Sequence, residues 1–148
     1  MPSAIASLAA CNSNNNPGPV PTLGPTCQLP SGVQTALVYP APNSTVSASS
    51  VTQLIIGSTA ALDPGRFQIV ITDAVFPFPN FVRPGGSLAS VSPPFPSPNT
   101  TPTFANPQYQ SSTLNAQFAT SQVVTVYVND SKSGDNCTPL SLGQFTTQ

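Results

Sequence analysis

The stretch Val123–Val128, with the sequence VVTVYV, decides the fold class of this 148-residue chain. Its residues are β-branched or aromatic, which suits a pleated strand better than a helix. Successive side chains of a strand point to opposite faces, so Val124, Val126 and Val128 share one face and the residues between them share the other. The stretch therefore predicts a strand in a sheet that packs on one face.

Other short apolar runs, each bounded by Pro, Gly, Asn or Asp, have the same character. Phe67, Ile69 and Ile71 share one face of such a run, and the continuous run Gln53–Gly57 predicts a more fully buried strand. Helical periodicity is absent. The predicted strands are Val33–Tyr39, Val51–Ile56, Phe67–Ile71, Gly86–Val91, Gln108–Leu114, Val123–Val128 and Gly143–Thr147. About seven strands with frequent turn signals predict an all-β protein, an antiparallel β-sandwich.

Three segments carry a resemblance to a family. Leu37–Asn43 is similar to a first strand running into a Pro-rich turn, Leu114 followed by Val123–Val128 to the E–F corner and F strand, and Leu142–Thr147 to a terminal G strand. Together they resemble the immunoglobulin-like and fibronectin type III-like sandwiches of bacterial surface lipoproteins. The chain has no Trp, which separates it from antibody-type domains. The resemblance implies a fold and a surface role, and it implies no reaction.

The N-terminal motif Leu8-Ala9-Ala10-Cys11 resembles a bacterial lipobox, the site of signal cleavage and lipidation. The resemblance implies a lipid on the thiol of Cys11 and a bacterial source. Met1–Ala10 contains no Lys or Arg and is shorter than an ordinary signal, so we expect a truncated leader. The alternative is a chance match in an Ala-rich segment.

A change of composition divides the chain into three parts. Residues 1–11 form the truncated signal segment, residues 12–26 form a flexible tether of Asn, Pro, Gly and Thr, and residues 27–148 form one domain. A domain of this size can bury a hydrophobic core. We expect it outside the cell, held on the membrane by the lipid at Cys11.

The chain has three cysteines, and an odd thiol in an exported protein needs an explanation. Lipidation of Cys11 supplies one and leaves Cys27 and Cys137 as a pair. A disulfide between them would join the start of the domain to its last hairpin. The alternative is two buried free thiols in a reducing compartment.

Charge and composition exclude several function classes. The chain has 3 basic and 4 acidic residues, no His and a net charge of −1. Without His, neither a Ser-His-Asp nor a Cys-His catalytic arrangement is possible, and zinc sites built on His are excluded. No basic footprint for nucleic acid exists. We therefore expect neither an enzyme nor a cofactor-binding protein.

Four phenylalanines stand in Pro-rich segments, where the backbone is extended and irregular: Phe76, Phe78, Phe81 and Phe95. One interpretation is an apolar contact surface for a partner protein or for another copy of the chain. The other is that the rings fold back and cap the open ends of the sandwich. We favour the second, because exposed loops without charges need such cover.

Two weaker candidates remain. Asp130 and Asp135 lie in a run of oxygen donors that would suit Ca²⁺, but the spacing differs from an EF-hand and a plain hairpin turn explains the composition. Carbohydrate stacking on Tyr39, Tyr109 or Tyr127 is the other, and strand-internal positions favour core packing instead.

The sequence thus predicts a non-catalytic structural or adhesive module with a lipid anchor in the membrane and a cell-surface protein, or a second copy, as partner. The alternative is a secreted domain without lipid that binds a glycan or a peptide.

Overall fold

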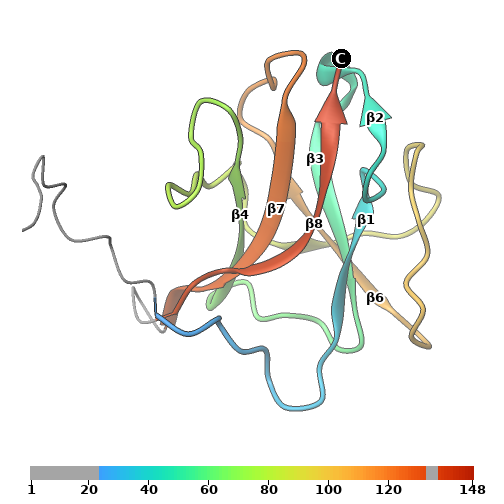
Figure 1. The fold of residues 1–148 in the computed structure, drawn as a ribbon. Coiled ribbons are helices and arrows are strands. Elements are labelled where there is room, and N and C mark those ends of the chain that lie inside the picture. The colour runs from blue at the N-terminus through green and yellow to red at the C-terminus, as the bar shows by residue number, and fades with distance from the viewer. Residues whose placement is uncertain (1–23, 133–136) are drawn as a thin grey trace, which may run out of the picture.

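The computed structural model describes residues 24–132 and 137–148 (Figure 1). These residues form eight strands and one short 3-10 helix: β1 Thr35–Tyr39, β2 Thr45–Val46, η1 Ala48–Ser50, β3 Gln53–Ser58, β4 Phe67–Thr72, β5 Ala89–Ser90, β6 Gln108–Thr113, β7 Val123–Asp130 and β8 Leu140–Thr147. Each of the seven predicted strands is present, and β5 is shorter than predicted. β2 lies outside the predicted set. The all-β prediction is confirmed.

The strands form two four-stranded sheets. The first sheet has the order β1-β3-β6-β5 and is antiparallel throughout. The second sheet has the order β2-β8-β7-β4, in which β2 runs parallel to β8 and the other pairs are antiparallel. Two sheets of this kind are compatible with a β-sandwich.

The core contains side chains from both sheets, and the predicted alternation is confirmed. Val124, Val126 and Val128 are at most 1% exposed, whereas Val123 on the other face is 51% exposed. Strand β3 is buried from Leu54 to its end, as its continuous apolar run predicts. Outside β3, the largest fully buried side chains of the core are Tyr39, Phe145, Leu37, Leu62 and Ile69.

A disulfide closes one end of the second sheet. Cys27 and Cys137 are bonded, which confirms the predicted pair. Next to the bond the backbone N–H of Cys27 donates to the carbonyl of Thr138, and the N–H of Thr138 donates to the carbonyl of Pro25. Pairing with Thr138 therefore begins upstream of Cys27, within the range predicted as tether. The C-terminus lies at the other end of β8 (Figure 1).

Candidate functional site

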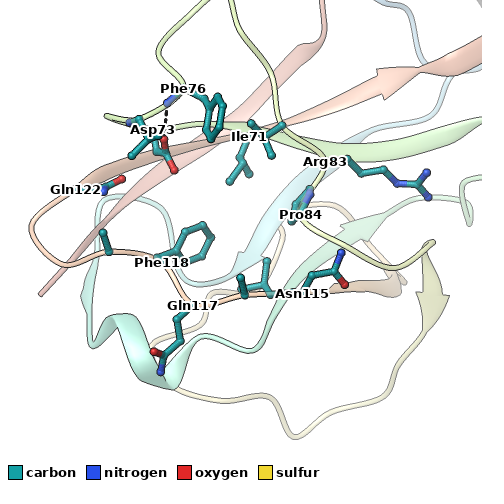
Figure 2. Close-up of a pocket in the computed structure, with 14 residues that line it drawn as sticks. Ile71, Asp73, Phe76, Arg83, Pro84, Asn115, Gln117, Phe118 and Gln122 are labelled. Atoms are coloured by element: carbon teal, nitrogen blue, oxygen red, sulfur yellow. Dashed lines mark hydrogen bonds between the residues drawn. The ribbon is translucent and has the colours of Figure 1, made fainter.

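A pocket of about 400 Å³ lies beside the end of β7 that pairs with the last residues of β8 (Figure 2). We call it the end pocket. Its walls come from the loop after β4 and from the segment between β6 and β7. Ile71 and Phe76 lie on one side of it and Phe118 on the other. The volume is within the range of about 300–1,000 Å³ that is usual for ligand sites.

A turn stabilised by the side chain of Asp73 forms part of the wall that comes from the loop after β4. Its Oδ1 accepts the backbone N–H groups of Val75 and Phe76, both at 2.8 Å. The backbone N–H of Asp73 in turn donates to the carbonyl of Phe76 at 3.0 Å. Short acidic side chains stabilise turns in this way because they replace a backbone acceptor. The turn sets Val75 and Phe76 at the rim.

A short backbone pairing joins the two walls. The N–H of Gly86 donates to the carbonyl of Thr113, and the N–H of Asn115 donates to the carbonyl of Pro84, each at 3.0 Å. Gly85 lies between these bonds, opposite Leu114. A Cβ at Gly85 would collide with the carbonyl of Thr113, so this close approach requires glycine.

Gln122 is the buried polar residue of the end pocket. Its backbone N–H donates to Thr147 Oγ1 at 3.0 Å, and its carbonyl accepts the N–H of Thr147 at 2.8 Å. The residue is 9% exposed, and its side-chain oxygen has no hydrogen-bond partner among the residues that the structure describes. The backbone N–H and C=O of Gln122 are therefore both hydrogen-bonded, whereas its side-chain oxygen accepts no hydrogen bond from the described residues.

Two exposed apolar side chains, those of Val75 and Phe76, line this pocket. Among the described residues, the large hydrophobic side chains that are exposed are Val75 at 65%, Phe76 at 48%, Phe78 at 54% and Val123 at 51%. The pairing of Thr72 with Thr125 places Val123 at the end of β7 beside the loop that follows β4. We call these four residues the apolar patch. A cluster of this kind marks a site of interaction more often than scattered single residues do.

The four phenylalanines singled out in the sequence do not form one surface. Phe76 and Phe78 are exposed, whereas Phe81 is half-buried with its ring 5.0 Å from that of Tyr127. Phe95 is also half-buried, and its ring lies 4.8 Å from that of Tyr109 in the first sheet. Phe81 and Phe95 therefore fold back, as the second interpretation expects, but each ring packs on a tyrosine of a strand, in β7 and in β6 respectively. The contact-surface interpretation fits Phe76 and Phe78.

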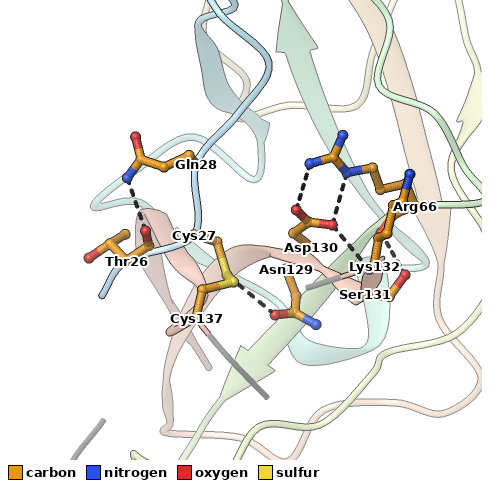
Figure 3. A network of polar contacts seen from close by, with 9 residues as sticks. All are labelled: Thr26, Cys27, Gln28, Arg66, Asn129, Asp130, Ser131, Lys132 and Cys137. Atoms are coloured by element: carbon orange, nitrogen blue, oxygen red, sulfur yellow. Dashed lines mark hydrogen bonds and ion pairs between the residues drawn. A yellow bond between two sulfur atoms is a disulfide. The ribbon is translucent and has the colours of Figure 1, made fainter. Parts of the chain in front are cut away.

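An ion pair near the disulfide holds β7 to the start of β4 (Figure 3). Arg66 donates to both carboxylate oxygens of Asp130, from Nε at 3.0 Å and from Nη2 at 2.8 Å. The backbone N–H of Lys132 donates to the same carboxylate at 3.1 Å. The pKa of Arg66 is raised by the hydrogen bond to Asp130 and by the negative charges of Asp130 and Asp63.

This network bears on the calcium candidate. Arg66 already neutralises the carboxylate of Asp130, so a cation at this carboxylate would have to compete with the guanidinium. Asp135, the second proposed ligand, lies outside the described residues. The nearby contact of Cys27 Sγ with Asn129 Oδ1, at 3.7 Å, is not a hydrogen bond because a disulfide sulfur carries no proton.

The tyrosines offer no open stacking platform. Tyr39 is 1% exposed, and its hydroxyl donates to the carbonyl of Ser50 at 3.4 Å. Tyr109 and Tyr127 are half-buried beneath phenylalanine rings. The core-packing prediction is confirmed for Tyr39.

The lipidation candidate Cys11 lies outside the described residues, as does the rest of the lipobox-like motif. In the part of the chain that the structure describes, no helix has the length and apolar character needed to span a bilayer. No cluster of three or more His, Cys, Asp or Glu side chains occurs there either.

Sequence reasoning missed Gln122 and the wall residue Phe118. The alternation that predicts β7 carried a signal for Gln122, because this residue stands two positions before Val124 and so falls on the same inward face. Phe118 lies in an irregular segment with no period to place it.

Comparison of the chain with protein-family models, with curated proteins and with solved structures found no match.

Proposed function

We propose that this protein is a non-catalytic interaction module that binds a partner polypeptide through the apolar patch and the end pocket. The observation that carries the proposal is that Val75 and Phe76, two of the four exposed large apolar residues among those that the structure describes, line one cavity, while Phe78 follows in the same loop and Val123 begins β7. Burying an apolar surface of this kind against a partner is favourable, and leaving it in water is not.

An immunoglobulin-like fold is part of the proposal, and strand order supports it. If β1, β3, β5 and β6 are equated with strands A, B, D and E, the order of the first sheet is A-B-E-D. With β4, β7 and β8 as strands C, F and G, the second sheet contains C-F-G and adds β2 beside G. These are the neighbours of an immunoglobulin sandwich.

An extracytoplasmic location is a further part of the proposal. The disulfide of Cys27 with Cys137 supports it, because such bonds persist in oxidising compartments. We place the domain at a bacterial cell surface, anchored by a lipid on Cys11, with a secreted form without lipid as the alternative. The intact mass of the protein from its native host decides between them. A chain that begins at acylated Cys11 supports the anchor, and an unacylated Cys11 thiol contradicts it.

A selection from a random peptide library tests the interaction. The wild-type domain and the variant Phe76→Ser/Phe78→Ser are used in parallel as bait, and a glycan array serves as a second screen. We expect peptides rich in large apolar residues to be enriched on the wild type and lost on the variant. The proposal fails if no peptide is enriched, or if the same peptides are enriched on both proteins.

A matched control keeps the result specific. Gln108→Ser changes an exposed residue of β6 in the other sheet, away from the patch. This variant is expected to enrich the same peptides as the wild type. Sedimentation of the wild-type domain in addition shows whether the patch binds a second copy of the chain instead, which would replace the peptide partner in the proposal.

A further inference from the structure

We propose that the amide of Gln122 pairs with the backbone of an extended segment of the partner polypeptide, while an apolar side chain of that segment enters the end pocket. The inference rests on the proposed function and names the chemistry by which the site would recognise its partner. Two observations carry it, one at Gln122 itself and one at Gln110.

Gln110 performs this recognition inside the protein. Its Oε1 accepts the backbone N–H of Leu62 and its Nε2 donates to the carbonyl of the same residue, each at 2.8 Å. The side chain of Leu62 is 2% exposed and belongs to the hydrophobic core. One glutamine thus holds one residue of an irregular segment by both backbone groups, with the apolar side chain of that residue buried.

Gln122 has the same residue type and comparable burial but lacks the partner. Gln110 is 3% exposed and Gln122 is 9% exposed. Among the described residues the Oε1 of Gln122 is buried and accepts no hydrogen bond. Buried polar groups are rarely left in this state, because the loss of hydration is not compensated. The terminal torsion of glutamine is broad, so the amide can rotate to turn its oxygen toward the cavity that Gln122 lines.

The surroundings favour a peptide as the occupant. A backbone residue supplies one N–H and one C=O side by side, which matches the donor and acceptor of an amide. The pocket between Ile71, Phe76 and Phe118 takes the side chain, and the exposed Val75 and Phe76 at its rim offer apolar surface to the rest of the segment. A free small molecule would fill the cavity and leave the patch uncovered.

The test compares two probes on the full chain by amide-resolved NMR titration. The first probe is N-acetyl-leucine methylamide, and the second is its ester analogue, in which the leucine N–H is replaced by oxygen. We expect the amide probe to shift resonances of residues 73–76 and 114–122. The ester is expected to bind roughly three- to tenfold more weakly, because it lacks the leucine N–H that would donate to Gln122.

Two variants assign this difference to one side chain. In Gln122→Met the amide and ester probes are expected to bind equally well. Gln108→Met makes the same chemical change at an exposed residue of β6, which does not line the pocket, and is expected to keep the wild-type preference for the amide. A melting temperature close to that of the wild type shows that each variant is folded.

The outcomes separate this inference from the function on which it rests. If Gln122→Met keeps the preference for the amide, or if the wild type shows none, the pairing is overturned while peptide binding by the patch stands. If neither probe shifts any resonance of the pocket, the pairing is overturned as well. Failure of the peptide selection would remove the proposed function itself.

Discussion

Asp130 and Arg66 form an ion pair whose two members differ sharply in exposure. The side chain of Asp130 is 3% exposed, whereas that of Arg66 is 38% exposed. Removing one partner therefore has unequal consequences. An Arg66 that loses the carboxylate can turn into solvent, but an Asp130 that loses the guanidinium keeps its negative charge in a buried position.

We accordingly expect Arg66→Gln to lower the free energy of unfolding more than Asp130→Asn does. The asparagine of the second variant still accepts the backbone N–H of Lys132. Chemical denaturation of the two single variants shows which one loses more stability. The double variant gives the coupling free energy between Arg66 and Asp130. A larger loss for Asp130→Asn would contradict the importance of the buried charge.

The dependence of stability on pH follows from the same pair and from the absence of His. The raised pKa of Arg66 means that the guanidinium keeps its charge through the neutral range, so on the arginine side the contribution of the pair is lost only at strongly alkaline pH. No side chain has an ordinary pKa near neutrality. We expect the free energy of unfolding to change by less than about 0.5 kcal/mol between about pH 8 and pH 5.5. A larger change in denaturation midpoints over this range would show that a further group titrates.

The two buried glutamines make a matched pair for mutation. Gln110→Met leaves the backbone N–H and C=O of Leu62 buried without partners, so we expect a loss of about 2 kcal/mol or more. Gln122→Met removes an oxygen that has no partner among the described residues, so we expect stability within about 0.5 kcal/mol of the wild type, or higher. Urea denaturation of both variants measures the difference. Equal losses would mean that the amide of Gln122 is satisfied in the free protein.

The disulfide is the covalent contribution to stability. Cys27 and Cys137 are separated by 110 residues, and on the chain-entropy model a loop of this size stabilises the folded state by about 4–5 kcal/mol. The variant Cys27→Ala/Cys137→Ala is expected to lose stability on this scale. Denaturation of the variant beside the oxidised wild type tests this. A loss below about 1 kcal/mol would show that the native pairing of residues 24–27 with Thr138 suffices to close this end.

Local pattern was enough to predict most of the strands. Val124, Val126 and Val128 alternate with more exposed residues, and this period gave β7 its correct inward face. The two-residue strand β2 has no period, and its parallel pairing with β8 is a contact between distant segments. No sequence pattern of that length specifies such a pair.

The candidate site was harder to predict because loops build it. Phe76, Phe78 and Phe81 follow one another in the same Pro-rich segment, yet the ring of Phe81 packs on Tyr127 and the other two remain exposed. The difference depends on how the loop returns over β4, where Val82 exchanges backbone hydrogen bonds with Ile71. Only the tertiary structure contains that information.

The central claim is that Phe76 and Phe78 bind a partner and do not cover the core. The most direct measurement is the affinity of the wild type and of Phe76→Ser/Phe78→Ser for a selected peptide, with the free energy of unfolding determined on the same samples. We expect the affinity to fall by about tenfold or more, since two rings leave the interface. The free energy of unfolding should stay within about 1 kcal/mol of the wild type, because both residues are about half exposed and lie outside the hydrophobic core. An unchanged affinity, or a loss of several kcal/mol in stability of the kind that core truncation causes, would contradict the claim.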